Sequence, residues 1–474
     1  MKIRSVIRKI FAVALLSHSI FAAHAQYSRI EIPDSAAVRT KVRDSWLKAT
    51  VKSLNGRPSE IYNDPAGGLF QVRSERIGQS IAVAVMPQTY LKVSYIRGDD
   101  VEVVDEPSYS LNSCGSWILF KNRNTGADEK IIIRFTENPD IYLQLKPLGK
   151  GTTADLIAYD SYLAKGKAVG IPFENLYTIS FPVIQRQCAK TIPWDMVLPA
   201  ANQYGTVQAM ISVIRDKLPS VSYAEDAAYN EDGKLYSIEK GNDYKKDESD
   251  KMLDYYLKEQ PKEISDQGTL VLGAPGFVKW IVDGIIYPMT GKLSRISDLV
   301  MPTTTPDPLS KQGVLSSKWN MTLNLDWNRH LAEKVTSLRS VKGRYSYETG
   351  GTDVNDNFFI SEIQEDGRIV PSLGYTKNVG YESKRLLPLL YVLAATEPDW
   401  FYIGAIRHTS SITTGESVFD GNAAFFPYFR DDGKFDCVVF QNGKELTIRQ
   451  FITNNPNAYV HLERIKSYEG FDPQ

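Results

Sequence analysis

The spacing of hydrophobic residues changes along the chain and predicts different elements in its two halves. Between residues 35 and 54, apolar side chains recur every three or four positions, which predicts a helix with one buried face. That face either packs on the helix's own domain or docks a partner. From 59 to 185, short runs rich in β-branched and aromatic residues alternate with turn residues. This region therefore predicts a β-rich domain, built as a sandwich or a small barrel.

The second half of the chain mixes helical and strand patterns. Residues 207–218 have the spacing of an amphipathic helix, and a hairpin is predicted around the turn at 230–233. Residues 385–396 are strongly apolar and predict a core helix. Strands of an antiparallel sheet are predicted at 401–406, 423–426, 437–440 and 459–465.

The stretch Gly273–Gly284 organises this half, because there an apolar run turns into a helical pattern. Pro275 suits a first helical turn, and Gly276 allows another backbone to approach closely. The stretch resembles the nucleophile helix of the NlpC-type cell-wall cysteine peptidases, a papain-like family whose motif reads Asp-Cys-Ser-Gly-Phe-Val. Residues 276–278 match the end of that motif, whereas Ala274 stands at the position of the cysteine.

The resemblance implies that both catalytic groups of the family are absent. The family's nucleophile is a thiolate, which a helix N-terminus favours, and Ala274 has no thiol. The family's histidine begins a later strand, and the nearest matching run, Asp420–Pro427, contains Asn422 but no histidine. Asparagine cannot replace imidazole as a base at neutral pH. The implied cleft would be flanked by Gly273, Pro275, Trp280, Asp420 and His408.

The N-terminus has the pattern of an export signal. Four basic residues precede an apolar stretch, and Ala23-His24-Ala25 is a small-x-small cleavage sequence. We therefore expect an exported protein, periplasmic or extracellular. The whole pattern predicts an α+β protein, with a β-rich domain before a papain-like one. Its parts are a signal peptide (1–25), an N-terminal helix (26–58), the β-rich domain (59–185) and the NlpC-type domain (190–474).

Charge and composition narrow the classes of partner. Cleavage of the signal removes four positive charges and changes the formal net charge from −1 to −5. A negative chain is a poor ligand for nucleic acids and anionic membranes. No run after the signal is long enough to span a membrane.

Cysteine and histidine are scarce. An exported chain could join Cys114 to Cys188, or all three cysteines, Cys437 included, could be buried free thiols. Only three histidines follow the signal, and no spacing suits zinc, so we expect neither a metal nor another cofactor. Residues 325–332 hold Asp326, Arg329 and His330, which suit either a catalytic cluster or a helix cap with an ion pair.

Three functions remain open on these residues. The first is a non-catalytic pseudo-peptidase that binds a peptidoglycan fragment, a peptide or an envelope protein in its cleft. The second is a cell-wall peptidase or amidase with a relocated catalytic set, such as His408 with Asp326 or a serine. The third is a structural interaction protein, for which the charged, tyrosine-containing segment 239–263 is a candidate partner site.

Overall fold

The structure is a computed structural model. It describes residues 32–97, 100–199, 202–238, 242–243, 270–304, 322–409 and 417–474. The expected signal peptide lies outside the described residues, and so does nearly all of segment 239–263. None of the described helices is long and apolar enough to cross a membrane.

Three short helical segments begin the described chain. Ser35 caps the first segment, since its Oγ accepts a hydrogen bond from the amide of Val38 at 3.0 Å. The region 35–54 was expected to form a single helix, but it is divided into three segments. Its apolar side chains are buried in the chain's own core, as the packing alternative predicts. The segments are α2 (Ala36–Val42), η1 (Arg43–Leu47) and α3 (Val51–Leu54).

A ten-stranded antiparallel sheet forms the body of the N-terminal part. Side chains alternate between its faces, so Ile81, Val83 and Val85 join the main core, whereas Ala82 and Ala84 join a smaller cluster on the other face. In spatial order the strands are β1 (Glu60–Asn63), β2 (Leu69–Ile77), β3 (Ser80–Pro87), β6 (Trp117–Asn122), β7 (Asp128–Arg134), β8 (Ile141–Leu148), β9 (Gly151–Ala158), β10 (Ser161–Ala168), β16 (Ser361–Ile363) and β17 (Ile369–Pro371).

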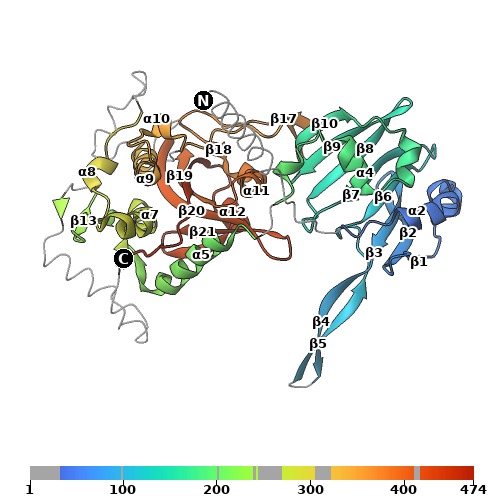
Figure 1. The fold of residues 1–474 in the computed structure, drawn as a ribbon, viewed down its shortest axis with the longest axis horizontal. Coiled ribbons are helices and arrows are strands. Elements are labelled where there is room, and N and C mark those ends of the chain that lie inside the picture. The colour runs from blue at the N-terminus through green and yellow to red at the C-terminus, as the bar shows by residue number, and fades with distance from the viewer. Residues whose placement is uncertain are drawn as a thin grey trace, which may run out of the picture.

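A two-stranded ribbon leaves this sheet. Its strands are β4 (Thr89–Arg97) and β5 (Asp100–Ser108), which pair with each other in an antiparallel register. Figure 1 shows the ribbon projecting from the end of β3, away from the rest of the molecule. Among the described residues, no third strand pairs with it.

A six-stranded antiparallel sheet forms the centre of the C-terminal part. Its strand order is β18 (Tyr381–Glu382), β23 (Tyr459–Lys466), β19 (Trp400–Thr409), β20 (Ser417–Phe429), β21 (Phe435–Gln441) and β22 (Lys444–Thr447). The helices that contact it include α5 (Gly205–Lys217), α7 (Ala274–Thr290), α9 (Leu323–Arg339), α11 (Leu386–Thr396) and α12 (Ile448–Asn454). Helix α7 is apolar on almost all sides, so it is buried between the sheet and α9.

Smaller elements surround this sheet. The predicted hairpin around 230–233 is confirmed, and it packs against α7. The strands are β11 (Val221–Tyr223), β12 (Ala227–Tyr229), β13 (Leu235–Ser237), β14 (Asn242–Asp243) and β15 (Leu270–Leu272). The helical turns are η2 (Phe173–Tyr177), α4 (Phe181–Gln187), η3 (Trp194–Met196), η4 (Leu218–Ser220), α8 (Ile296–Leu299), α10 (Tyr347–Gly350) and η6 (Ser383–Arg385).

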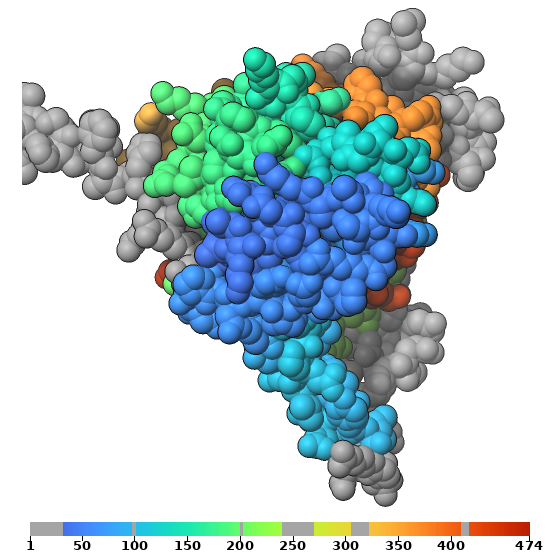
Figure 2. Space-filling view, turned by 90° about the vertical axis from the view of Figure 1, so that its right-hand side faces the viewer, coloured from blue at the N-terminus to red at the C-terminus, as the bar shows by residue number. Residues whose placement is uncertain are grey.

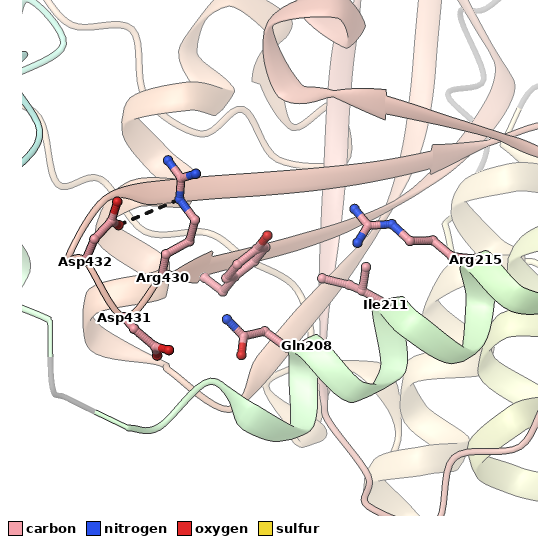
Figure 3. A pocket seen from close by; sticks show the side chains of 7 residues that line it. Gln208, Ile211, Arg215, Arg430, Asp431 and Asp432 are labelled. Atoms are coloured by element: carbon pink, nitrogen blue, oxygen red, sulfur yellow. Dashed lines mark ion pairs between the residues drawn. The ribbon is translucent and has the colours of Figure 1, made fainter. Parts of the chain in front are cut away.

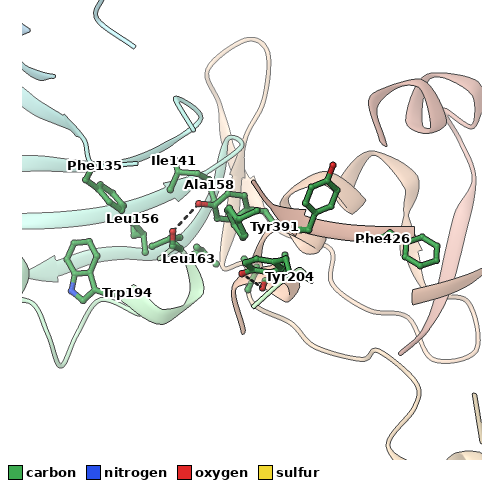
Figure 4. Packing of buried hydrophobic residues seen from close by; sticks show 14 of the residues in the cluster. Phe135, Ile141, Leu156, Ala158, Leu163, Trp194, Tyr204, Tyr391 and Phe426 are labelled. Carbon is green, nitrogen blue, oxygen red and sulfur yellow. Dashed lines mark hydrogen bonds between the residues drawn. The ribbon is translucent and has the colours of Figure 1, made fainter. Parts of the chain in front are cut away.

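One hydrophobic core continues from the N-terminal part into the C-terminal part. Figure 4 shows side chains from β8, β9 and β10 on one side of Tyr391 and Tyr204, with Phe426 beyond them. The Tyr391 hydroxyl donates to the carbonyl of Val197 at 3.0 Å, and the Tyr204 hydroxyl donates to the carbonyl of Ala394 at 3.0 Å. Both polar tips are satisfied, so the junction is packed like a domain interior.

The expected fold class is wrong. An α+β protein with a papain-like C-terminal domain was predicted, but antiparallel sheets of ten and six strands dominate the described chain. The sandwich or barrel expected over 59–185 is also replaced, because a single sheet takes its last two strands from residues 361–371. That pairing joins residues about 200 positions apart in the sequence, and local patterns carry no information about it.

Candidate functional site

The start of helix α7 is covered instead of lining a cleft. Ala274 begins the helix, as predicted, but it is only 8% exposed. The segment around β12 lies directly against it, so a Cβ added to Gly276 would collide with the carbonyl oxygen of Ala227. Gly273 is also closely packed, since a Cβ added there would lie 3.0 Å from the carbonyl oxygen of Ala224. The predicted cleft residues Gly273, Ala274 and Pro275 therefore contact protein, and the glycines serve close packing.

The polar partner of Asn422 comes from a different helix. Asn422 is fully buried on β20, and its Nδ2 donates to Asn324 Oδ1 at 3.0 Å. Asn324 belongs to α9, and its own Nδ2 donates to the carbonyl of Phe419 at 2.8 Å. Helix α7 does contact β20, but the hydrogen-bond partner of the Asn422 side chain comes from α9.

His408 forms a surface ion pair. Its Nδ1 lies 2.6 Å from Asp420 Oδ1, and its Nε2 lies 3.2 Å from Asn455 Oδ1. The hydrogen bond to Asp420 raises the pKa of His408, although partial burial opposes this. Asp326, its suggested catalytic partner, is instead buried and accepts hydrogen bonds from Thr303 and Thr322. Both ring nitrogens of His408 already have partners, so the relocated catalytic pair is not assembled.

A buried polar network, which sequence reasoning missed, links α9 to β23. Arg329 Nη2 lies 2.6 Å from Asp353 Oδ2, and its Nε lies 3.2 Å from Asp353 Oδ1. On β23, His461 Nδ1 lies 2.7 Å from Glu463 Oε1, and His461 Nε2 lies 2.9 Å from the Tyr375 hydroxyl. Arg329 thus pairs with Asp353 and not with Asp326, and α9 has no side-chain cap, so the cap and ion pair predicted within 325–332 differ from the observed arrangement. The available signal was the spacing of His461 and Glu463, which places both on one face of a strand.

The electrostatics of this network favour structure over chemistry. Burial lowers the pKa of His461 well below its ordinary value, and the charge of Arg329 acts in the same direction. Burial, aided by the charge of Asp353, raises the pKa of Glu463 well above its ordinary value. Asp353, His461 and Glu463 together have the donor types of a metal site. The Arg329 guanidinium already occupies the cation's place, since it contacts Asp353 and lies 3.5 Å from His461.

The thiols are protected from reaction. All three cysteines are free and buried, so Cys114 and Cys188 are not joined in the structure. Burial raises the pKa of Cys114 to about 12 and that of Cys188 to about 11. Burial also raises the pKa of Cys437 well above its ordinary value. Thiolate is the nucleophilic form, so none of these groups is activated near neutral pH.

A partly enclosed cavity of about 200 Å³ lies beside helix α7. Trp280, the remaining predicted cleft residue of that helix, lines it together with Tyr229, Leu270, Leu272 and Leu293. Two charged side chains of the same helix also reach it, Lys279 and Asp283. The lining is thus mostly apolar, with one localised polar feature.

The two charges at this cavity neutralise each other. Lys279 Nζ lies 2.5 Å from Asp283 Oδ2, and both side chains are almost fully buried. Asp283 Oδ1 accepts hydrogen bonds from the amide of Ser294 at 2.9 Å and from its hydroxyl at 2.6 Å. Asp283 is therefore fixed on both oxygens, and it is the hydrogen-bond partner identified for Lys279 within the described chain. An ammonium has three donors, so Lys279 retains hydrogen-bonding capacity at the cavity.

A second hollow is open and highly charged. It lies between α5 and the turn after β20, with a volume of about 460 Å³ (Figure 3). Arg430 and Asp432 form an ion pair across its rim at 3.8 Å. Arg215 is held by Glu445 through two hydrogen bonds of 2.8 and 2.6 Å. Three of its charged residues, Arg215, Arg430 and Asp432, thus have ion-pair partners, and the cavity beside α7 is the more enclosed of the two sites.

The comparisons with known proteins are limited to the N-terminal part. Residues 28–196 match a family model described as a domain of unknown function, DUF8515. The matched region ends before α5, so it contains most of the ten-stranded sheet and the ribbon but not the cavity beside α7. Neither the curated proteins nor the solved structures give a match.

Proposed function

We propose that this chain is an exported, non-catalytic binding protein that holds an apolar side chain of a peptide ligand in the cavity beside α7. The cavity itself is the observation that supports this function. It combines an aromatic and leucine lining with one paired charge, the usual composition of a ligand site. Its volume, about 200 Å³, exceeds that of a cavity of about 150 Å³ that binds benzene.

A binding role agrees with the state of the reactive groups. The described thiols are buried with raised pKa values. His408 and His461 are hydrogen-bonded through both ring nitrogens to groups that are not nucleophiles in the sense of a peptidase. A nucleophile–base pair of the kind that peptidases use is therefore not seen among the described residues.

The chemistry of the cavity lining favours one of the ligand classes that the sequence suggested. A glycan chain needs many hydrogen bonds, and the described lining offers few polar groups that are not already paired. A leucine-like or phenylalanine-like side chain would bury its apolar surface against Trp280 and Leu272. The carbonyl group of a peptide would then have Lys279 as a donor. A peptide, including the peptide part of a peptidoglycan fragment, is thus favoured over a saccharide.

Binding can be tested by saturation-transfer NMR on the full mature chain. The probes are N-acetyl-phenylalanine amide, N-acetyl-leucine amide and the N-acetylglucosamine dimer. We expect transfer to the two amides and none to the sugar. The variant Leu293→Trp fills the cavity and should weaken amide binding at least about tenfold, whereas Leu338→Trp, at a site that is 38% exposed on α9, should not.

Two results would contradict the proposal. One is the absence of transfer to either amide. The other is binding that Leu293→Trp leaves unchanged, since the ligand would then occupy another surface. Circular dichroism of both variants shows whether the fold is retained.

A further inference from the structure

The ribbon formed by β4 and β5 exposes apolar side chains on both faces. One face carries Tyr90 (64% exposed), Ile96 (77%), Val101 (64%) and Val103 (57%). The opposite face carries Leu91, Val93, Tyr95 and Val104, of which Leu91 is 57% exposed. Figure 2 shows the ribbon projecting below the body of the protein.

Such a ribbon is expected to need a partner. Two strands alone are marginally stable in water, and here both sheet edges and both apolar faces are uncovered by the described chain. An exposed edge with β-branched and aromatic residues is a template for another strand. The two edges differ in how well they could accept one.

The β5 edge is protected against pairing. Pro107 cannot donate a backbone hydrogen bond, and Glu102, Asp105 and Glu106 crowd this strand with negative charge. Paired with its own copy about Val104, β5 would place Glu102 opposite Glu106 twice. Like charges directly opposite each other destabilise a strand pair.

The β4 edge has the opposite character. Between Tyr90 and Ile96 its single charged residue is Lys92. Antiparallel pairing with a second copy about Val93 would place Tyr90 opposite Ile96 and Leu91 opposite Tyr95, each pair occurring twice. Lys92 would lie opposite Ser94, so no like charges face each other. The sequence of β4 is therefore complementary to itself in this one register.

We propose that two copies of this chain associate through β4, forming a four-stranded antiparallel sheet in the order β5-β4-β4-β5 with Val93 on the two-fold axis. Both faces of the joined ribbon gain from this pairing. On one face, Tyr90 of each copy covers Ile96 of the other, and on the opposite face Leu91, Val93 and Tyr95 form a continuous apolar stripe. Strand addition supplies the main-chain hydrogen bonds.

The pairing is smaller than a standard protein interface, so we expect a weak dimer with a dissociation constant in the micromolar range. Sedimentation velocity of the full mature chain across that range measures this association directly. The register gives a sharper test, because across the proposed interface Val93 lies directly opposite Val93 of the second copy. Val93→Lys and Val93→Glu should each weaken dimerisation at least about tenfold, through loss of a central apolar pair and like-charge repulsion.

An equimolar mixture of the two variants should restore the dimer, because Val93→Lys then faces Val93→Glu. The matched control is Val104→Lys. It lies opposite Val93 within the ribbon and on the same face, but on the strand away from the two-fold axis, so dimerisation should persist.

The dimerisation assay uses variants of the ribbon only, so its outcome does not depend on whether the cavity beside α7 binds a ligand. A chain that stays monomeric throughout, a dimer that both Val93 variants leave intact, or a mixture that does not recover would each overturn the proposed pairing. Binding of the monomer to vesicles of neutral lipid through Ile96 and Val101 would also overturn it, because the ribbon would then serve a membrane surface.

Discussion

Replacing Glu463 with glutamine should change how the free energy of unfolding depends on pH. Glu463 lies on β23, is fully buried and is 2.7 Å from His461 Nδ1. Burial and the nearby charge of Asp353 raise its pKa well above the ordinary value of 4.5, while the charge of Arg329 opposes the rise. The native protein therefore retains a proton on this carboxyl group over a range in which the unfolded chain has lost it.

The sign and size follow from proton linkage. Above pH 4.5 the unfolded chain binds one proton fewer than the native protein at this group, so wild-type stability falls as pH rises. The slope is about 1.4 kcal/mol per pH unit between pH 4.5 and the native pKa. The amide of Glu463→Gln does not titrate, so the variant should gain stability relative to wild type with the same slope. Below about pH 4 the difference should be constant.

The assay is urea unfolding of both proteins at several pH values, followed by tryptophan fluorescence and circular dichroism. His461 is present in both proteins, so its own titration largely cancels in the difference. Leu462→Val, a non-titrating change on the same strand, should lower stability by the same amount at every pH. A difference between Glu463→Gln and wild type that stays flat above about pH 5, or that falls, would refute the reasoning.

Two other predictions follow from the buried groups. Arg329→Met should lower the free energy of unfolding by about 3–5 kcal/mol, because it leaves Asp353 without its buried guanidinium partner; urea unfolding measures this, and a change below about 1 kcal/mol would contradict it. The native protein should react slowly with a disulfide-exchange reagent and rapidly after unfolding, because burial raises the pKa of its thiols; fast labelling of the folded chain would contradict the buried state of Cys114, Cys188 and Cys437.

Local patterns predicted the elements of the C-terminal part well. The helix expected after Gly273 begins at Ala274, and the core helix expected over 385–396 is α11. The four strands expected from 401 to 465 lie within β19, β20, β21 and β23. These elements have strong hydrophobic periodicity or apolar runs of the right length, and such signals depend only on near neighbours.

The arrangement of those elements could not be predicted in the same way. A short motif match suggested that α7 faces a catalytic strand, but a helix that is apolar on almost all sides gives little indication of which side is functional. Helix α7 does contact β20, but the polar group that reaches Asn422 is Asn324 of α9. Likewise, Lys279 and Asp283 are four positions apart in an apolar helix, a spacing that signals a buried pair but not the cavity beside it.

Burial shapes both the polar network around Arg329 and the proposed binding surfaces. A buried ion pair such as Arg329–Asp353 gives little net stability, since desolvation offsets most of its attraction, but it fixes which side of α9 faces β23. Groups held this way cannot approach a substrate. The two proposed interactions instead use apolar features, the Trp280 cavity and the β4–β5 ribbon.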